Sequence, residues 1–539
     1  MGVVFYSQSM NYTNTSKNTF AITTPLYYVN DVPHLGSAYT TIAADVVARF
    51  QRLRGLSVLM ITGTDEHGQK IERTAQAYGR SPQEHCDLIA SSFVELWELL
   101  GIKYDRFSRT TAVRHQAIVK EFFGRVWDAG DIYLGQQKGF YCVSCEEFKE
   151  ERDLLENHRC PLHPNREAEW RDEQNYFFRL SKYQNQLEAL YAEQPNFIQP
   201  ESRRNEVLNF VRQGLQDFSI SRVNLDWGFP VPTDPNHTLY VWFDALLGYV
   251  TALLEDGDEP TLANALAKWW PINIHLIGKD ILRFHAVYWP AMLMSAQLPI
   301  SGGVFGHGFL TKDGQKMGKT LGNTVDPVDL VRRYGADAVR YYFVKEIEFG
   351  KDGDLNETRF VNVLNADLAN DLGNLLNRTL KMAQKYCGGK VPPVAPEDIP
   401  SDNALKAIGM ELGQRVTPAY ENLAFSQGCE EILTLVRSSN KYIDEQAPWT
   451  LYKQKQQQAL EQVLYAVLES VRLAAYLLSP VTPKLSSSIY QQLGISLDLS
   501  QTTGDAAATF ATHAQWGMLA ANHTLGEPHP VFQRLELVS

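Results

Sequence analysis

The stretch His34-Leu35-Gly36-Ser37 lies between an apolar segment, 19–24, and an amphipathic segment, 38–53. Apolar residues in the second segment recur at helical spacing, so the sequence predicts a strand, a loop and a helix N-terminus in this order. Such an N-terminus carries unpaired N–H groups and a partial positive charge, and a glycine ahead of it lets a ligand approach the backbone. The stretch therefore predicts an α/β sheet with a place for a phosphate or an adenine.

The alternation of strand and helix continues to about residue 115. A second strand-like run, 57–62, is followed by Asp65 and His67, and a later run, 275–278, ends in the polar pair Lys279-Asp280. Ligand groups collect at the carboxyl ends of parallel strands, which is where these side chains fall. Asp65 is equally explained as a helix N-cap.

Two other nucleotide sites are excluded by their spacing. No G-x-G-x-x-G follows a strand, so a nicotinamide or flavin dinucleotide site is not supported. The segment 314–320 has three residues between Gly314 and Gly318 where a P-loop requires four. A P-loop is also followed directly by a helix, and no helix is predicted immediately after residue 320. We therefore reject the P-loop.

Length and charge limit the organisation of the chain. A chain of 539 residues is too long for one hydrophobic core and suggests several domains. The net charge of -12 argues against a protein that binds nucleic acid indiscriminately. No apolar run is long enough for a membrane span, and residues 1–18 lack a signal pattern, so we expect a disordered N-terminal tail and a cytoplasmic protein.

Four residues between 116 and 230 have the spacing of a zinc site. They are Cys142, Cys145, Cys160 and His163, arranged as two knuckles. This spacing suits tetrahedral Zn²⁺, and four protein ligands predict a structural ion. The alternative is a set of reduced, buried thiols.

After residue 320 the sequence becomes helical almost to its end. Windows near 361–386, 403–422, 428–446 and 449–478 have helical periodicity and are joined by Gly- or Pro-containing segments, as in a helix bundle. Trp449 follows a proline at a helix start, where it serves as a packing residue or as a platform for stacking a base. We expect an extended tail over 499–539.

The N-terminal stretch and the later Lys316-Met317-Gly318-Lys319-Thr320 together resemble the two signature motifs of class I aminoacyl-tRNA synthetases. From Phe20 to the end of the helical part the chain resembles the methionyl-tRNA synthetase family, beginning with 24–30 and His34-Leu35-Gly36. Ser37 stands where the family usually has a second histidine, and Gly318 and Thr320 replace two serines of the second motif.

The resemblance implies a fold and its boundaries. It implies an α/β fold with a doubly wound, nucleotide-binding parallel sheet of the HUP-type, Rossmann-like class, formed by 19–115 and 231–325. A zinc-bearing connective insertion, 116–230, separates these halves. A stem-contact linker, 326–360, then leads to an all-α anticodon-binding bundle, 361–498.

The resemblance also assigns roles to residues. The catalytic set is His34, Gly36, Ser37, Lys316 and Lys319. The ATP-binding set is His34, Gly36, Ser37, Gly278, Lys279, Asp280 and Lys319. The methionine-binding set is Leu26, Tyr28, Asp65, Trp242, Ala245, Leu246, Tyr249, Ile281 and His285. The anticodon-binding set is Asn374, Arg378 and Trp449. Without the resemblance, Trp242, Ala245, Tyr249 and His285 would be taken for core residues, and Asn374 and Arg378 for solvated helix surface.

The implied activity is methionine–tRNA ligation. Methionine would be activated by ATP, with Mg²⁺, to methionyl-adenylate and then transferred to initiator and elongator tRNA(Met). We expect one structural Zn²⁺ per chain and no membrane partner. Because the family's C-terminal dimerising module is lacking, we also expect a monomer. The alternatives are another class I synthetase of the same subclass, a non-catalytic tRNA-binding paralogue, and a small nucleotidyltransferase.

Overall fold

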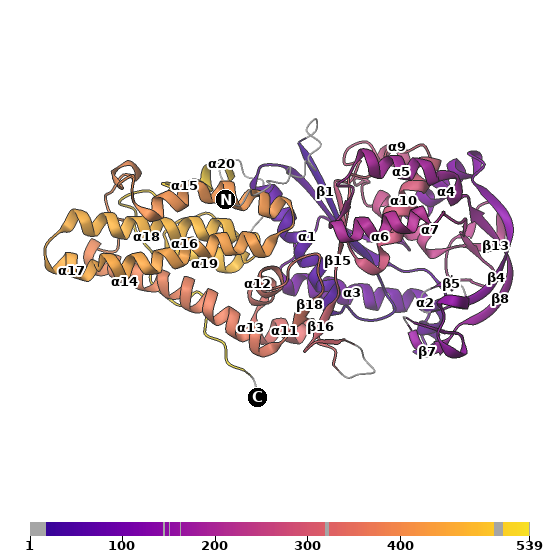
Figure 1. Ribbon diagram of the computed structural model, residues 1–539, viewed down its shortest axis with the longest axis horizontal. Helices are drawn as coiled ribbons and strands as arrows, with labels where there is room; N and C mark the ends of the chain where they lie inside the picture. Colours follow the sequence, from indigo (N-terminus) through magenta and orange to yellow (C-terminus); the bar gives the residue numbers. More distant parts are fainter. Residues whose placement is uncertain are drawn as a thin grey trace.

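The computed structural model describes residues 18–143, 146–149, 151–161, 163–317, 323–500 and 510–537, with His163 and Lys316 described by their backbone alone. The described chain forms an elongated molecule, with a helical bundle at one end, a parallel sheet in the middle and a smaller β-rich part at the other end (Figure 1). The class of fold agrees with the sequence prediction.

The central sheet has six parallel strands in the order β3-β2-β1-β14-β15-β9. In that order their bounds are Arg106–Arg109, Ser57–Asp65, Thr19–Tyr28, Ile274–Gly278, Val304–His307 and Ile198–Gln199. The strand order reverses direction at the β1/β14 pair, and in doubly wound sheets this is where a crevice opens at the carboxyl ends of the strands. The edge strand β9 comes from the stretch that the sequence assigned to the insertion, so that stretch also completes the main sheet.

Side chains alternate between two hydrophobic cores along the middle strands. On β1, Phe20 and Ile22 point into one core, which contains helices α1 (Leu35–Leu53) and α3 (Pro82–Leu100). Ala21 points into the other core, with helices α4 (Val113–Asp128) and α10 (Trp289–Ser295). Because both faces are covered, the strands read as continuous apolar runs.

Antiparallel strands form the insertion. Strands β10 (Phe218–Ser219), β8 (Glu169–Phe178), β4 (Ile132–Cys142) and β5 (Glu147–Lys149) make one sheet, and β6 (Arg159–Cys160) pairs with β7 (His163–Glu167). The helices α5 (Gln184–Glu193) and α6 (Glu201–Arg212) of the same stretch pack into the core that also holds α4 and α10. The insertion is therefore continuous with the catalytic part.

Long helices form the bundle. They are α13 (Glu357–Leu364), η7 (Asn365–Gly373), α14 (Asn374–Cys387), α15 (Ala404–Glu421), α16 (Phe425–Gln446), α17 (Pro448–Lys453), α18 (Gln457–Leu478) and α19 (Pro483–Gln492). The window 449–478, expected as one helix, is broken between α17 and α18, where Lys455 takes a positive φ of 57°. A left-handed residue ends an α-helix, which explains the break.

The C-terminal segment, expected to be an extended tail, contains the short helix α20 (Phe510–His513) and packs on the bundle. Arg472 donates to the carbonyl oxygens of His513 (2.8 Å) and Gln515 (2.7 Å), and the Leu519 N–H donates to Glu469. Near the end, the Leu535 N–H donates to Asn365. These bonds satisfy backbone groups that an extended segment cannot pair with itself.

A buried arginine joins the bundle to the sheet. Arg340, on α12 (Ala336–Glu346), pairs with Asp45 of α1 at 2.6 Å and donates to the carbonyl oxygens of Pro480 and Val481. Asp45 belongs to α1, and Pro480 and Val481 to the α18/α19 turn, so one guanidinium links the first helix of the catalytic part to this turn.

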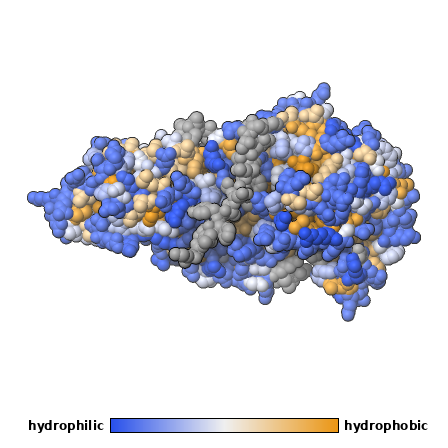
Figure 2. Space-filling view, turned by 45° about the horizontal axis from the view of Figure 1, so that its top comes forward, coloured by the Kyte–Doolittle hydropathy of each residue, from blue (hydrophilic) through white to orange (hydrophobic). Residues whose placement is uncertain are grey.

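In the described part of the chain, we find no helix whose length and apolar character would let it cross a lipid bilayer. Polar side chains dominate the face seen in Figure 2, with apolar residues in scattered groups.

Candidate active site

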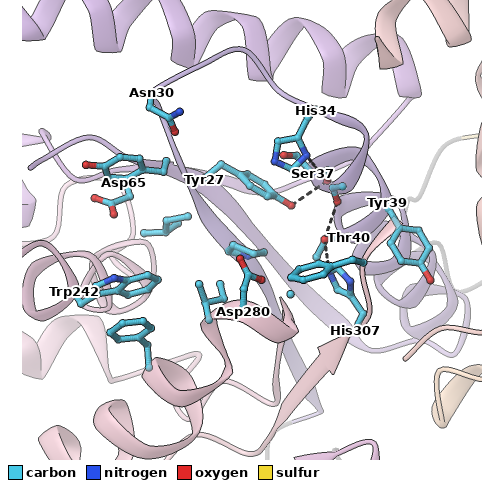
Figure 3. A pocket seen from close by; sticks show the side chains of 18 of the residues that line it. Tyr27, Asn30, His34, Ser37, Tyr39, Thr40, Asp65, Trp242, Asp280 and His307 are labelled. Atoms are coloured by element: carbon cyan, nitrogen blue, oxygen red, sulfur yellow. Dashed lines mark hydrogen bonds between the residues drawn. The ribbon is translucent and has the colours of Figure 1, made fainter. Parts of the chain in front are cut away.

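A cavity of about 420 Å³ opens at the carboxyl ends of β1, β14 and β15. Figure 3 shows side chains from both halves of the sheet turned toward it. Of the predicted residues it is lined by Leu26, Tyr28, His34, Gly36, Ser37, Asp65, Trp242, Gly278, Asp280 and Ile281. The two halves of the catalytic part, separated by more than 100 residues, thus meet around one space.

The His34 loop is built as a helix N-terminus. The His34 imidazole caps α1, because its Nδ1 accepts the Ser37 N–H at 3.2 Å. Ser37 is 2% exposed and still lines the cavity. A side chain at Gly36 would lie 3.0 Å from the His34 ring, so glycine keeps this approach to the backbone open.

His307, at the end of β15, lines the same cavity and was not found from the sequence. Its Nε2 lies 2.6 Å from the Thr40 hydroxyl, and its Nδ1 donates to the Gly308 carbonyl oxygen at 2.7 Å (Figure 3). Burial lowers the pKa of His307, so the ring is neutral. The only sequence signal would have been a histidine at a strand end, which is weak.

A second, smaller cavity of about 10 Å³ adjoins the first. It is lined by Pro25, Leu26, Asp65, Trp242, Ala245, Leu246, Tyr249, Ile281 and His285. These include all of the predicted methionine-binding residues except Tyr28, which lines the larger cavity. A space of this size accommodates about one water molecule. The structure therefore brings together the side chains that the resemblance grouped, and it holds them in a nearly closed arrangement.

Aromatic and imidazole rings close the smaller cavity. Trp242 of α7 (Val241–Ala245) stacks on Phe284, with ring centres 3.9 Å apart and planes 6° apart. The Tyr249 hydroxyl lies 2.8 Å from His285 Nε2, and His285 Nδ1 donates to the Ile281 carbonyl oxygen. Burial lowers the pKa of His285 to about 4, so Nε2 accepts the tyrosine proton.

Carboxylates collect on the side of the cavity next to β2. Asp65 is 4% exposed, and its Oδ1 has no hydrogen-bond partner among the described residues. Burial, then the nearby Asp244 and Glu146 carboxylates, raise the pKa of Asp65 well above its ordinary value. A ligand cation at this carboxylate would relieve both penalties.

Glu146 is a cavity residue that sequence reasoning missed. It comes from the insertion, directly after Cys145, and its Oε1 accepts the Lys70 N–H at the start of α2 (Gln69–Ala77) at 2.9 Å. Gly68 has a φ of 112°, and a side chain there would lie 2.5 Å from Glu146. Periodicity cannot relate an insertion loop to a distant helix, so the sequence held no signal for this contact.

Of the three predicted ATP contacts at the carboxyl end of β14, two line the cavity and one does not. Gly278 and Asp280 line the cavity, whereas the Lys279 ammonium is 2.6 Å and 2.8 Å from the two Asp352 oxygens and lies over the Phe309 ring. Lys279 does not itself line the cavity, although Phe309 does, and its predicted contact with ATP stays a prediction. Phe284 lines the cavity without having been predicted.

The second motif is only partly described. Lys316 lies on β17 (Gln315–Lys316), whose backbone pairs with β16 (Leu310–Lys312) in a hairpin. Lys319, Gly318 and Thr320 lie outside the described residues, as does the Lys316 side chain. Their predicted roles stay predictions.

The predicted anticodon residues lie at the far end of the bundle. Trp449 is 42% exposed on α17, which forms the tip in Figure 1. Arg378 donates to Asp444 and to the Asn440 carbonyl oxygen near the end of α16, and Asn374 is exposed one helical turn before Arg378. The three residues therefore share one end of the bundle.

Part of the predicted zinc set is described. Cys142 and Cys160 are buried at the ends of β4 and β6, and Cys160 pairs in register with His163 across the hairpin. Cys145 and the His163 side chain lie outside the described residues. Within the described residues, no cluster of three metal-ligating side chains is found.

Comparisons with known proteins identify a family over nearly the whole chain. A family of class I tRNA synthetases (M) matches residues 20–164 and 149–380, and an anticodon binding domain of methionyl tRNA ligase matches 395–536. The chain is 72% identical to a methionine–tRNA ligase of Nostoc sp. over 98% of this chain and 99% of that protein, and 70% identical to that of Synechocystis sp. over 97% and 99%. A Mycobacterium tuberculosis methionyl-tRNA synthetase in complex with methionyl-adenylate matches 96% of this chain and 100% of its own, at 41% identity and a TM-score of 0.89.

Proposed function

The chain belongs to the class I methionyl-tRNA synthetases, and from this membership we propose how its residues divide the work of methionine–tRNA ligation. The enzyme activates methionine with ATP and transfers it to tRNA. The single observation that carries the residue assignments is the meeting of the His34 loop, the β14 end and the aromatic residues in one cavity.

In the first step the methionine carboxylate attacks the α-phosphorus of ATP, a new P–O bond forms, and pyrophosphate leaves. This reaction needs no protein nucleophile, so catalysis comes from orientation and from neutralising charge. We assign the phosphates to the α1 N-terminus with His34 and Ser37, and the adenine to the backbone at Gly36. Lys316 and Lys319 act on the pyrophosphate, and Mg²⁺ bound to ATP neutralises part of the triphosphate charge.

Methionine recognition is assigned to the carboxylate side and the aromatic side of the two cavities. The buried Asp65 carboxylate, which has an oxygen without a partner, takes the α-ammonium. The thioether enters between Trp242, Tyr249 and His285, where a polarisable sulfur packs well against rings. Since the smaller cavity holds about 10 Å³, the rings must move apart as methionine binds.

In the second step the terminal ribose hydroxyl of the tRNA attacks the adenylate carbonyl, and AMP leaves. We propose that Asn374, Arg378 and Trp449 contact the anticodon at the far end of the bundle. Trp449→Ala is expected to raise the KM for tRNA while methionine-dependent ATP–pyrophosphate exchange stays normal, because Trp449 lies far from the cavity. Equal damage to both reactions would assign Trp449 a structural role.

The insertion is proposed to hold one Zn²⁺ through Cys142, Cys145, Cys160 and His163. The two buried thiols at strand ends and the register of His163 opposite Cys160 fit a ligand set of this type. A bound ion would cross-link segments that have little core of their own. A monomeric state and a cytoplasmic location stay predictions from the sequence.

ATP–pyrophosphate exchange with each of the twenty amino acids tests the assignment directly. Exchange with methionine alone, together with charging of tRNA(Met), is the expected result. Exchange with another amino acid would identify a different synthetase of the subclass. Intact tRNA binding without any exchange would identify a non-catalytic paralogue.

A further inference from the structure

A buried carboxylate, Asp244, joins two histidines behind the methionine cavity. Its Oδ2 accepts from His67 Nδ1 at 2.5 Å, and its Oδ1 accepts from His115 Nε2 at 2.7 Å. Asp244 is 1% exposed and His115 is fully buried. Both oxygens are therefore used, and the two histidines hold the pKa of Asp244 near 2 despite its burial.

The three residues come from three elements that build the methionine site. His67 follows the carboxyl end of β2 and is two residues after Asp65. Asp244 lies on α7, two residues after Trp242 and one before Ala245. His115 lies near the start of α4, the helix that packs against α8 (Gly248–Thr251), and α8 carries Tyr249. The network thus connects the ammonium contact with the aromatic wall.

Neighbouring side chains restrain both histidines of the network. The Phe229 ring lies edge-on to His67 at 4.6 Å, and the Trp227 ring lies at 5.7 Å. On the far side, His115 Nδ1 lies 2.7 Å from the Thr251 hydroxyl. Phe229 also packs on His115, at 5.8 Å, and among the described residues Asp244 joins the two imidazoles by hydrogen bonds.

We propose that Asp244 is a positioning residue for methionine, which fixes the separation between Asp65 and the aromatic pocket by accepting from His67 and His115 at once. This inference rests on the proposed roles of Asp65 and Trp242. An amino acid fits only if its thioether reaches the rings while its ammonium rests on Asp65. Asp244 touches neither group itself, and it acts through the positions of His67 and His115. Its charge also raises the pKa of Asp65, and His115→Gln, which keeps that charge, tests the effect of position alone.

Asp244→Asn in the full chain tests the proposal. The amide keeps the shape of the carboxylate but offers one acceptor oxygen, so one histidine loses its partner. The expected result in ATP–pyrophosphate exchange is a rise of about 10- to 100-fold in the KM for methionine, as for a lost interaction of this kind, with the KM for ATP nearly unchanged. The preference for methionine over its ethyl thioether homologue, measured as a ratio of kcat/KM, is expected to fall.

His115→Gln gives a second measurement if the first variant folds poorly. His115 touches Asp244 and Thr251 and does not line either cavity. The same selective rise in the KM for methionine is expected, and in the double variant the two effects should not add, because they break one network.

Glu469→Gln is the matched control. Glu469 is also a fully buried carboxylate with several donors, but it lies on α18 in the bundle. Its loss is expected to lower Tm without changing either KM. Equal changes in the KM for methionine and for ATP in the Asp244 variant, or none, would overturn the proposal. A wild-type chain without methionine-dependent exchange would instead refute the proposed function.

Discussion

The two cavities of the active site differ in how far they are formed before any ligand is present. The larger one, about 420 Å³, is bordered by strand ends and a helix N-terminus, with both polar and aromatic side chains. The smaller one, about 10 Å³, is bordered by rings in contact with one another. The nucleotide side is open, and the amino-acid side is nearly closed.

This difference means that the larger cavity can bind ATP as it stands, whereas the smaller cavity selects among amino acids by the rearrangement that each side chain requires. ATP presents phosphates and an adenine to backbone groups whose positions are fixed by the sheet and by α1, so little reorganisation is needed. An amino acid must instead separate Trp242 from Tyr249 and His285, the rings that border the smaller cavity. Only a side chain that makes equally favourable contacts with the rings compensates for the contacts that are lost when the rings separate.

Lys316→Ala is the change with the largest expected effect, and it acts on the nucleotide side alone. Removing a cation that acts on the developing charge is expected to lower the rate of adenylate formation by about 10²- to 10³-fold, with the Kd for methionine unchanged. Single-turnover kinetics and equilibrium binding separate the two quantities. Lys312→Ala, on the neighbouring strand β16, is the control and should be near wild type. An unchanged rate in Lys316→Ala would remove this lysine from the mechanism.

Asp65→Asn changes the amino-acid side of the active site. Loss of the ammonium partner is expected to raise the KM for methionine by about 10- to 100-fold, which corresponds to roughly 1.4–2.7 kcal/mol, while the KM for ATP stays constant. Asp280→Asn is the reciprocal control, because Asp280 lines the larger cavity. It should change the KM for ATP and spare methionine. If both variants damaged both constants equally, the two cavities would not act separately.

The pH dependence of methionine activation follows from the same carboxylate. Burial and the neighbouring carboxylates raise the pKa of Asp65, so it is protonated at a higher pH than an exposed aspartate. Protonated Asp65 does not attract an ammonium ion, and the KM for methionine is expected to rise as the pH falls through this pKa. Asp65→Asn should lose this limb of the profile. A limb of equal size in the variant would assign the titration to another group.

The sequence predicted the nucleotide side from local pattern and the amino-acid side from resemblance. The strand, loop and helix around His34 are encoded by residues close in the chain, and α1 begins at Leu35, slightly before the predicted segment 38–53. The residues that were missed, Glu146, Phe284 and His307, reach the cavity from separate segments. The ion pair of Lys279 with Asp352, 73 residues later, was likewise not foreseen. Such contacts depend on tertiary packing, which periodicity does not report.

Trp242 should report the opening of the smaller cavity. When methionine separates Trp242 from Tyr249 and His285, the environment of the indole changes, so methionine is expected to alter the tryptophan fluorescence of the enzyme more than ATP alone does. Trp242→Phe should lose most of this signal and keep a stacked pair. An equal signal with ATP, or an undiminished signal in the variant, would show that the rings do not move on methionine binding.

Tyr249→Phe is the smallest change and tests how finely the closed side is tuned. The neutral His285 ring donates through Nδ1 to Ile281 and accepts the Tyr249 proton at Nε2, so the variant leaves one buried acceptor without its donor. The expected cost is about 1 kcal/mol, or roughly a fivefold rise in the KM for methionine, with ATP unaffected. Measurement of both KM values in the exchange reaction decides this. Since the aromatic ring is kept, a much larger loss would mean that the hydroxyl contacts the thioether directly, and no loss would mean that the rings alone close the pocket.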